Sequence, residues 1–113
     1  MEIGTWAKEL PYAVTVCDKQ GVIVSMNDKA CLNYAKYGGA ELIGKNLLDC
    51  HGPKSRKIVE DMLVNQTSSH YTTEKNGIKK FIAQTPWYDQ GEYGGIVEVS
   101  MEIPFDTPHY IRK

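Results

Sequence analysis

The first part of the chain alternates apolar and polar side chains in two short runs. Residues 12–18 alternate with a period of two, and residues 21–26 form a second, mostly apolar run. Asp18-Lys19-Gln20-Gly21 lies between them, and Gly21 can adopt the positive φ that a tight turn needs. The pattern predicts a half-buried antiparallel hairpin.

Residues 2–10 precede this hairpin and have a helical period. Ile3, Trp6, Ala7 and Leu10 fall on one side, and Pro11 ends the segment because the residue before a proline avoids the α region. About nine residues are too few for a helix that is stable alone. We therefore expect an amphipathic helix that packs either on its own sheet or against a second copy of the chain.

The stretch 27–45 predicts short helices. Asn27 and Asp28 suit a helix N-terminus, Gly38-Gly39 breaks the helical pattern, and Gly44 ends it. A connector at 46–51 leads to Pro53, which fits the first turn of a helix. Residues 54–65 then predict an amphipathic helix lying on the sheet, with its apolar stripe formed by Ile58, Val59, Met62 and Leu63.

The last third of the chain predicts three strands, over 67–74, 78–87 and 93–103. Asn76-Gly77 is a strong hairpin signal, and residues 89–92 form another turn. Pro86 indicates an edge position or a bulge near the end of its strand. In the last strand the wholly apolar set should face the core and the other set should face away; these sets are Val97, Val99, Met101, Ile103 and Glu98, Ser100, Glu102.

Composition narrows the function classes. With 113 residues and 42% hydrophobic content the chain can form one domain with a real core. A net charge of −1 gives no basic face for nucleic acid. There is no apolar run of the ~20 residues that cross a bilayer, and no signal peptide at the N-terminus. Three cysteines without a C-x-x-C pair suggest free thiols, so we expect a cytoplasmic protein that binds neither nucleic acid nor membrane.

Catalytic motifs are missing from the sequence. It has no nucleophile elbow, Walker loop, zinc-protease motif or dinucleotide fingerprint, so we do not expect an enzyme. Cys50-His51 invites a metal interpretation, but zinc needs four ligands and the other candidates, Cys17, Cys31, His70 and His109, are scattered. We expect no metal site.

The order of these elements, with Asn27 after an apolar strand, Ala30, Gly38 and then E-L-I-G-K at 41–45, resembles the PAS sensor family. The resemblance extends over about Leu10 to Pro104. It implies an α+β fold, with a five-stranded antiparallel sheet and short helices on one face. The expected division is an N-terminal helix at 1–10, the sensor domain at 11–104 and a tail at 105–113.

The resemblance also implies how such a domain acts. A ligand or partner shifts the population between two arrangements, and the change reaches an unidentified effector through a homodimer interface. The segments 47–55 and 91–99 resemble a narrower PAS subgroup of bacterial and archaeal sensory proteins, which has a Cys-His-Pro-like helix start. This chain departs from that pattern with Gly52 in place of proline and Gln90 in place of aspartate.

The candidate cofactors are implied by the resemblance to the PAS family and not by the composition. Some PAS domains hold haem through a histidine beside the sheet, and His51 is the best axial candidate; its other interpretation is a helix-start residue bonded to backbone. The light-oxygen-voltage branch forms a flavin adduct through a cysteine. Leu47 stands at that position here and Cys50 is three residues late, so the photoadduct mechanism is not expected.

Taken together, these patterns predict a pocket between the sheet and the helices. The expected ligand-binding residues are Asn27, Tyr34, Leu47, His51, Ile58, Met62, Tyr71, Phe81 and Val97. Three functions stay open: a sensor of a small ligand of unknown identity, a haem or flavin sensor, and a protein-interaction module in which the aromatic side chains fill the core.

Overall fold

A single five-stranded antiparallel sheet forms the centre of the computed structural model, which describes residues 1–113. The strands lie in the order β2-β1-β5-β4-β3, so the last strand in sequence lies in the middle of the sheet. Their bounds are Ala13–Cys17 (β1), Ile23–Met26 (β2), Ser69–Lys75 (β3), Ile78–Asp89 (β4) and Glu92–Ile103 (β5).

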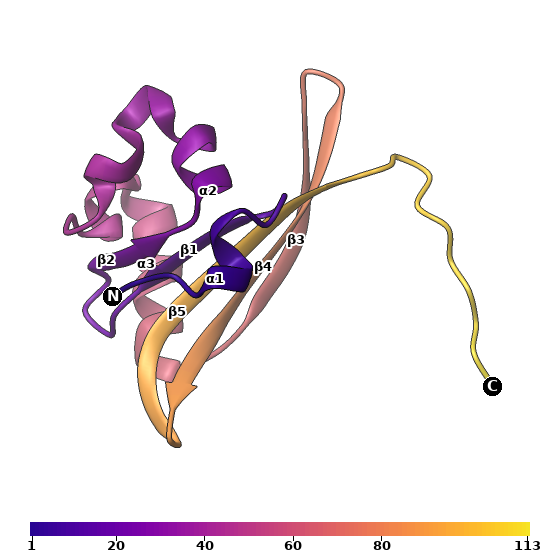
Figure 1. The fold of residues 1–113 in the computed structure, drawn as a ribbon. Coiled ribbons are helices and arrows are strands. Elements are labelled where there is room, and N and C mark those ends of the chain that lie inside the picture. The colour runs from indigo at the N-terminus through magenta and orange to yellow at the C-terminus, as the bar shows by residue number, and fades with distance from the viewer.

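Most helices lie on one face of this sheet, at its β1–β2 end (Figure 1), whereas the tip of the β3–β4 hairpin extends beyond them. The predicted α+β architecture is confirmed. No helix is both long enough and apolar enough to cross a bilayer. The helices are α1 (Thr5–Lys8), α2 (Asp28–Asn33) and α3 (Pro53–Asn65), with 3₁₀ turns η1 (Ala35–Tyr37), η2 (Gly39–Leu42) and η3 (Leu47–Cys50) between α2 and α3.

The turns between the last three strands and the start of α3 are as the sequence predicts. Asn76 and Gly77 both have positive φ, 54° and 78°, and join β3 to β4 in a two-residue hairpin turn. Gln90 and Gly91 do the same between β4 and β5. Pro53 occupies the first turn of α3, as expected. These turns fix which residues pair across the sheet.

Asn27 is the residue on which the N-terminal half converges. It is 0% exposed, and its Oδ1 accepts hydrogen bonds from the backbone N–H groups of Val14 (2.9 Å) and Ala30 (3.0 Å). Its Nδ2 donates to the carbonyl oxygens of Ala7 (2.9 Å) and Tyr12 (2.7 Å). One side chain therefore caps α2, as predicted from its type, and also ties α1 and the start of β1 together.

The N-terminal helix is shorter than expected. The predicted helix over 2–10 is wrong in length, because α1 is one turn, Thr5–Lys8. The apolar stripe is also divided: Ala7 is 1% exposed whereas Trp6 is 77% exposed. Asn27 binds the carbonyl oxygen of Ala7, so only that side of the turn faces the domain.

The predicted faces of β5 are reversed. Glu98 pairs with Thr15 of β1 and Gln84 of β4, and all three side chains lie on the helix-covered face. Val99 pairs with Val14 on the opposite face, together with Val97. The reason is that β5 is a central strand whose outward face is also partly buried, so the apolar set fits that face.

Two glycines of β5 lie at a bulge in that strand: Gly94, the extra residue, packs against the Trp87 ring of β4, and Gly95 lies against β1. The register of the β4–β5 pair shifts between Trp87 and Tyr88, where β5 carries the extra residue. Pro86 itself is at an edge, the first of its two predicted settings, because the pairing of β4 with β3 ends at Gln84. A Cβ on Gly94 would collide with the Trp87 ring, and one on Gly95 would collide with the carbonyl oxygen of Cys17. That oxygen accepts the indole N–H of Trp87 at 2.9 Å. The two glycines therefore let three strands approach closely.

Candidate ligand-binding cavity

A cavity of about 640 Å³ lies between the sheet and the helices. Its size falls in the range typical of small-molecule sites. Most of its wall is apolar. The lining residues are Thr15, Cys17, Ile23, Met26, Tyr34, Tyr37, Leu42, Lys45, Leu47, Cys50, His51, Val59, Met62, Gln84, Ile96 and Glu98.

Three polar side chains meet on the sheet side of this cavity. Gln84 Nε2 donates to Glu98 Oε2 at 2.7 Å, and the Tyr34 hydroxyl donates to Glu98 Oε1 at 3.4 Å. Burial, and then the nearby Glu98 charge, raise the pKa of the Tyr34 phenol well above its usual value of 10.0. Tyr34 therefore stays a neutral donor, and Glu98 is a carboxylate held by two neutral partners.

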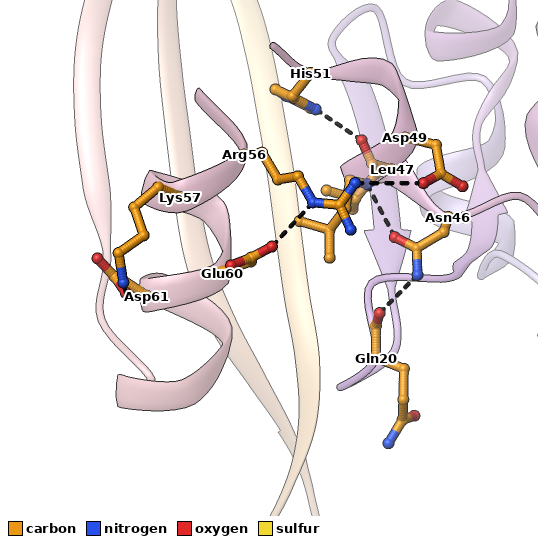
Figure 2. Close-up of polar contacts among 10 residues, drawn as sticks. Gln20, Asn46, Leu47, Asp49, His51, Arg56, Lys57, Glu60 and Asp61 are labelled. Atoms are coloured by element: carbon orange, nitrogen blue, oxygen red, sulfur yellow. Dashed lines mark hydrogen bonds and ion pairs between the residues drawn. The ribbon is translucent and has the colours of Figure 1, made fainter. Parts of the chain in front are cut away.

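The rim of the cavity is formed around η3. His51 is exposed, and its Nδ1 lies 2.7 Å from the carbonyl oxygen of Leu47, as Figure 2 shows. A carbonyl can only accept, so Nδ1 is the donor of this bond, and in the neutral imidazole Nε2 then carries the lone pair. Lys45 and Cys50 complete this part of the wall, and both are exposed.

Charged side chains join η3 to α3 outside the cavity. Arg56 lies between Glu60 (Nε–Oε1, 3.0 Å) and Asp49 (Nη1–Oδ1, 3.7 Å), and Lys57 pairs with Asp61 at 2.8 Å (Figure 2). These pairs are exposed, so they contribute little to stability. Only the Arg56–Asp49 pair links η3 to α3; the other two pairs lie within α3.

Backbone hydrogen bonds attach the end of the short-helix segment to the edge strand. Gly44 N donates to Ile23 O at 2.8 Å, Ile23 N donates to Lys45 O at 2.9 Å, and Leu47 N donates to Gly21 O at 2.9 Å. The Asn46 side chain extends this attachment by donating to Gln20 O at 2.9 Å. Residues 44–47 thus behave as an extra edge of the sheet and fix one wall of the cavity.

Four of the nine predicted site residues line the cavity: Tyr34, Leu47, His51 and Met62. The other five lie elsewhere. Asn27 is buried in the network described above, and Ile58 is 53% exposed, because α3 turns Met62 and Leu63 inward instead. Tyr71 lies on the cavity side of the sheet but is 44% exposed and does not line the cavity; Glu98 contributes, after burial, to raising the pKa of its phenol.

Phe81 and Val97 were expected in the cavity wall, and both expectations are wrong. Phe81 pairs with Met101 and stacks at 6.2 Å with His70, whereas its neighbour Ile82 pairs with Ser100 on the other face. Val97 pairs with Val16 on the same outward face as Phe81. Both follow from the reversed faces of the two long strands.

The sequence did not predict the polar side chains that the sheet contributes to the cavity wall, here called the polar wall. Thr15, Gln84 and Glu98 come from three strands and become neighbours only through the β1–β5–β4 register. A glutamate in an alternating strand usually marks a solvent-facing position, so nothing local distinguished Glu98. These three residues could have been recognised as neighbours from the strand pairing, but only once β5 was known to lie between β1 and β4.

The structure contains neither a disulfide bond nor a cluster of metal ligands. All three cysteines are unpaired, with Cys17 buried, Cys31 half-buried and Cys50 exposed. Burial is the main cause that raises the pKa of the Cys17 thiol above its usual value of 9.0, which makes it a poor nucleophile. No group of three or more His, Cys, Asp or Glu side chains is arranged to hold a metal ion.

The fold is shared with many solved structures. A C-terminal domain from Streptococcus mutans superposes with a TM-score of 0.67 at 20% identity, covering 86% of this chain and 79% of that chain. The PAS domain of Bordetella pertussis BvgS gives 0.62 at 18% identity, covering 88% and 82%. The Aer2 receptor of Vibrio cholerae, described as a dual PAS-heme oxygen sensor, gives 0.59 at 21% identity, covering 82% and 95%.

Comparison with functionally curated proteins gives no significant match. The sequence itself matches the family described as PAS fold over residues 7–103, which is most of the chain and includes every strand. The chain therefore belongs to the PAS family.

Proposed function

We propose that this chain is a sensory domain that binds a small, largely apolar molecule in the cavity between its sheet and helices. The observation that carries the proposal is the cavity of about 640 Å³, whose mostly apolar wall includes a hydrogen-bonded polar group of Tyr34, Gln84 and Glu98. Apolar walls with a few convergent polar groups are the usual composition of a ligand site. Comparable proteins support the sensory role, since one is described as a sensory box sensor histidine kinase from Vibrio cholerae.

Ligand binding has a structural route to the rest of the domain. The cavity is lined from β1, β2, β4 and β5 and from α3 and the short helices. Residues 44–47 are attached to β2 by backbone bonds, but η1 and η2 between Ala35 and Leu42 have no such bonds to the sheet. A ligand that favours one position of this stretch would shift the population between two arrangements.

The output is proposed to pass through a homodimer to an effector. Trp6 is 77% exposed although it sits beside the buried Ala7, and the outward face of β5 carries half-buried Val97 and Val99. An apolar surface of this kind is a candidate contact between two copies. We also propose a cytoplasmic location and no catalytic activity of the domain.

Haem binding is the second candidate, and His51 is the observation that favours it. Its Nδ1–H is engaged by Leu47 O, which leaves Nε2 free to act as an axial ligand at the cavity rim. Haem would supply gas or redox sensing when bound. An absorption spectrum after addition of hemin tests this: a Soret band that is lost in His51→Ala supports it, and an unchanged free-hemin spectrum contradicts it.

Methionine methyl groups give a sharp test of the cavity proposal. Of the four methionines, Met26 and Met62 line the cavity, whereas Met1 and Met101 do not. Protein labelled with ¹³C at the methionine methyls should show shifts of the first two signals when a small apolar probe such as indole is added. The signals of Met1 and Met101 serve as an internal control.

A pair of substitutions on α3 checks that the cavity is responsible. Val59 lines the cavity, and Val64 is on the same helix but 79% exposed. Val59→Trp should fill the cavity and abolish the indole-induced shifts, and Val64→Trp should leave them unchanged. If indole moves none of the methyl signals in the unmodified protein, the chain is better described as a protein-interaction module.

A further inference from the structure

Glu98 introduces a negative charge into a mostly apolar cavity, and no side chain of opposite charge is paired with it; Lys45, the one lysine in the wall, lies at the exposed rim. The molecule contains four ion pairs, and Glu98 takes part in none of them. Its two hydrogen-bond partners, Gln84 and Tyr34, are neutral. Glu98 is half-buried, and a carboxylate that is partly shielded from water gains from an opposite charge, which the protein does not pair with it.

The carboxylate also has bonding capacity left. Two carboxylate oxygens offer about four lone-pair directions, and the protein uses one on Oε1 and one on Oε2. Glu98 lines the cavity, so a molecule inside it can reach the remaining directions. A protonated amine carries several donors and a positive charge, and charge-assisted bonds of this kind are roughly twice as strong as neutral ones.

The surrounding wall selects the rest of the molecule. Met26, Met62, Leu42 and Ile96 present apolar surface, and methionine adapts well to an aromatic ring. The Tyr34 ring lies on the same wall as the carboxylate and can also face a cation. The cavity volume of about 640 Å³ leaves room for a compact ring system with a short amine side chain.

We propose that the ligand class of this cavity is a small cationic amphiphile, an aromatic or aliphatic body with one protonated amine that is bound by Glu98. This inference rests on the proposed function, because it names the chemistry of the same site. Lys45 and His51 at the exposed rim are the features that would favour the opposite choice, an anionic ligand, and the test includes that outcome.

Three probes of nearly equal shape separate these choices: 2-phenylethylamine, 2-phenylethanol and 3-phenylpropanoate. Each is titrated into methionine-methyl-labelled protein at neutral pH, and affinity is measured from the Met26 and Met62 signals. The amine should bind about tenfold or more tightly than the alcohol, the margin expected for a hydrogen bond to a charged group. The carboxylate probe should bind most weakly.

Two substitutions on β5 test whether the preference for the amine probe depends on the Glu98 carboxylate. Glu98→Gln keeps the shape and one acceptor but removes the charge, and it should reduce amine affinity to that of the alcohol. Glu102→Gln makes the same change on the same strand at an exposed position outside the cavity, and it should keep the amine preference. A cooperative thermal unfolding transition of each variant, compared with that of the unmodified protein, shows that it remains folded.

The results separate this inference from the proposal on which it rests. Equal binding of amine and alcohol, a preference for the carboxylate probe, or an amine preference that survives Glu98→Gln would overturn the amine inference, while the cavity would remain a binding site. Failure of all three probes and of indole to move the Met26 and Met62 signals would overturn both.

Discussion

Asn27 Nδ2 lies 2.9 Å from the carbonyl oxygen of Ala7, so a single side-chain bond connects the first helix to the strand–helix junction that starts the short-helix segment. The same amide also donates to Tyr12 O, and its oxygen accepts from two backbone N–H groups. The side chain is 0% exposed; three of its four bonds are fully buried and the bond to Tyr12 O is partly buried. Asn27 was expected to touch a ligand and instead holds the fold together.

Asn27→Ala should therefore be strongly destabilising. It leaves buried carbonyl and N–H groups unpaired, and each unsatisfied group costs about 1–3 kcal/mol, so a total loss of roughly 3 kcal/mol or more is expected. Urea unfolding measures it. Asn33→Ala, at an exposed position near the end of α2, is the matched control and should change the unfolding free energy by less than about 1 kcal/mol. Equal losses in both variants would contradict the role of Asn27.

Stability should fall in alkaline solution, in part through Tyr34. Its pKa is raised in the folded protein, mainly by burial, so the folded state keeps the phenol proton while the unfolded chain, with a value near 10.0, loses it. The stabilising contribution is complete below pH 10 and is lost as pH rises above it, with a slope of up to about 1.4 kcal/mol per pH unit for this group.

Tyr34→Phe should reduce that alkaline slope and change stability at pH 7 by no more than about 1 kcal/mol, because the bond to Glu98 is long. Thermal unfolding between pH 8 and 11 measures both effects. Burial also raises the pKa of Cys17, Tyr71 and Tyr93, so part of the slope should remain. Tyr110→Phe, at a 70% exposed position, should leave the slope unchanged; the same slope in the Tyr34 variant would show that Tyr34 does not contribute.

Comparing Gly95→Ala with Gly44→Ala should separate two energetic costs: a steric clash between β5 and β1, and an alanine at a positive φ. Gly95 (φ 144°) and Gly44 (φ 95°) both have positive φ, but a Cβ on Gly44 would meet nothing within 4 Å, whereas one on Gly95 would strike the Cys17 carbonyl. Both variants carry the conformational cost of about 1 kcal/mol or more. Gly95→Ala should cost about 2 kcal/mol beyond Gly44→Ala because β1 must move away from β5.

The measurement for this pair is chemical denaturation, supported by tryptophan fluorescence. Movement of the Cys17 carbonyl disturbs its bond to the Trp87 indole, so the emission of Gly95→Ala should change while that of Gly44→Ala should not. Similar costs for the two alanine variants would mean that the close approach of β1 and β5 contributes nothing.

Trp6→Ser should convert the proposed homodimer to a monomer. The side chain is 77% exposed, and its burial against a second copy would supply much of the apolar contact. Size exclusion with light scattering at tens of micromolar, roughly the working range of modest interfaces, measures the state. Leu32→Ser removes a comparably exposed apolar side chain, 69%, from α2 and should leave the dimer intact. A monomeric unmodified protein would contradict the proposal directly.

Features set by local chemistry were predictable from the sequence. The Asn76-Gly77 turn, the capping role of Asn27 and the start of α3 at Pro53 each depend on residues within a few positions of one another. The order of such features along the chain also led to the fold, since it resembles one family over most of its length.

The polar wall depends on distant residues and was not predictable. Whether Glu98 or Val97 faces the helices is decided by which strand lies on each side of β5 and by how much of the outward face is covered. Alternation shows only that the two residues face opposite ways. Ile58 shows the same limit of sequence patterns on a helix. Its apolar stripe has four positions, and the packing of Met62 and Leu63 decides which of the four stay exposed.

The position of β5 has a consequence for how the molecule is made. This strand is synthesised last, yet it lies between β1, the first strand, and β4. Residues 44–47 can already pair with β2, but β1 has no partner on its other side until the ribosome has released residues up to about Ser100, which pairs with Ala13. Closing such a distant pair is slow relative to forming hairpins. Thr15 and Glu98 meet in that same step, so the polar wall of the cavity is assembled only after β5 has been synthesised.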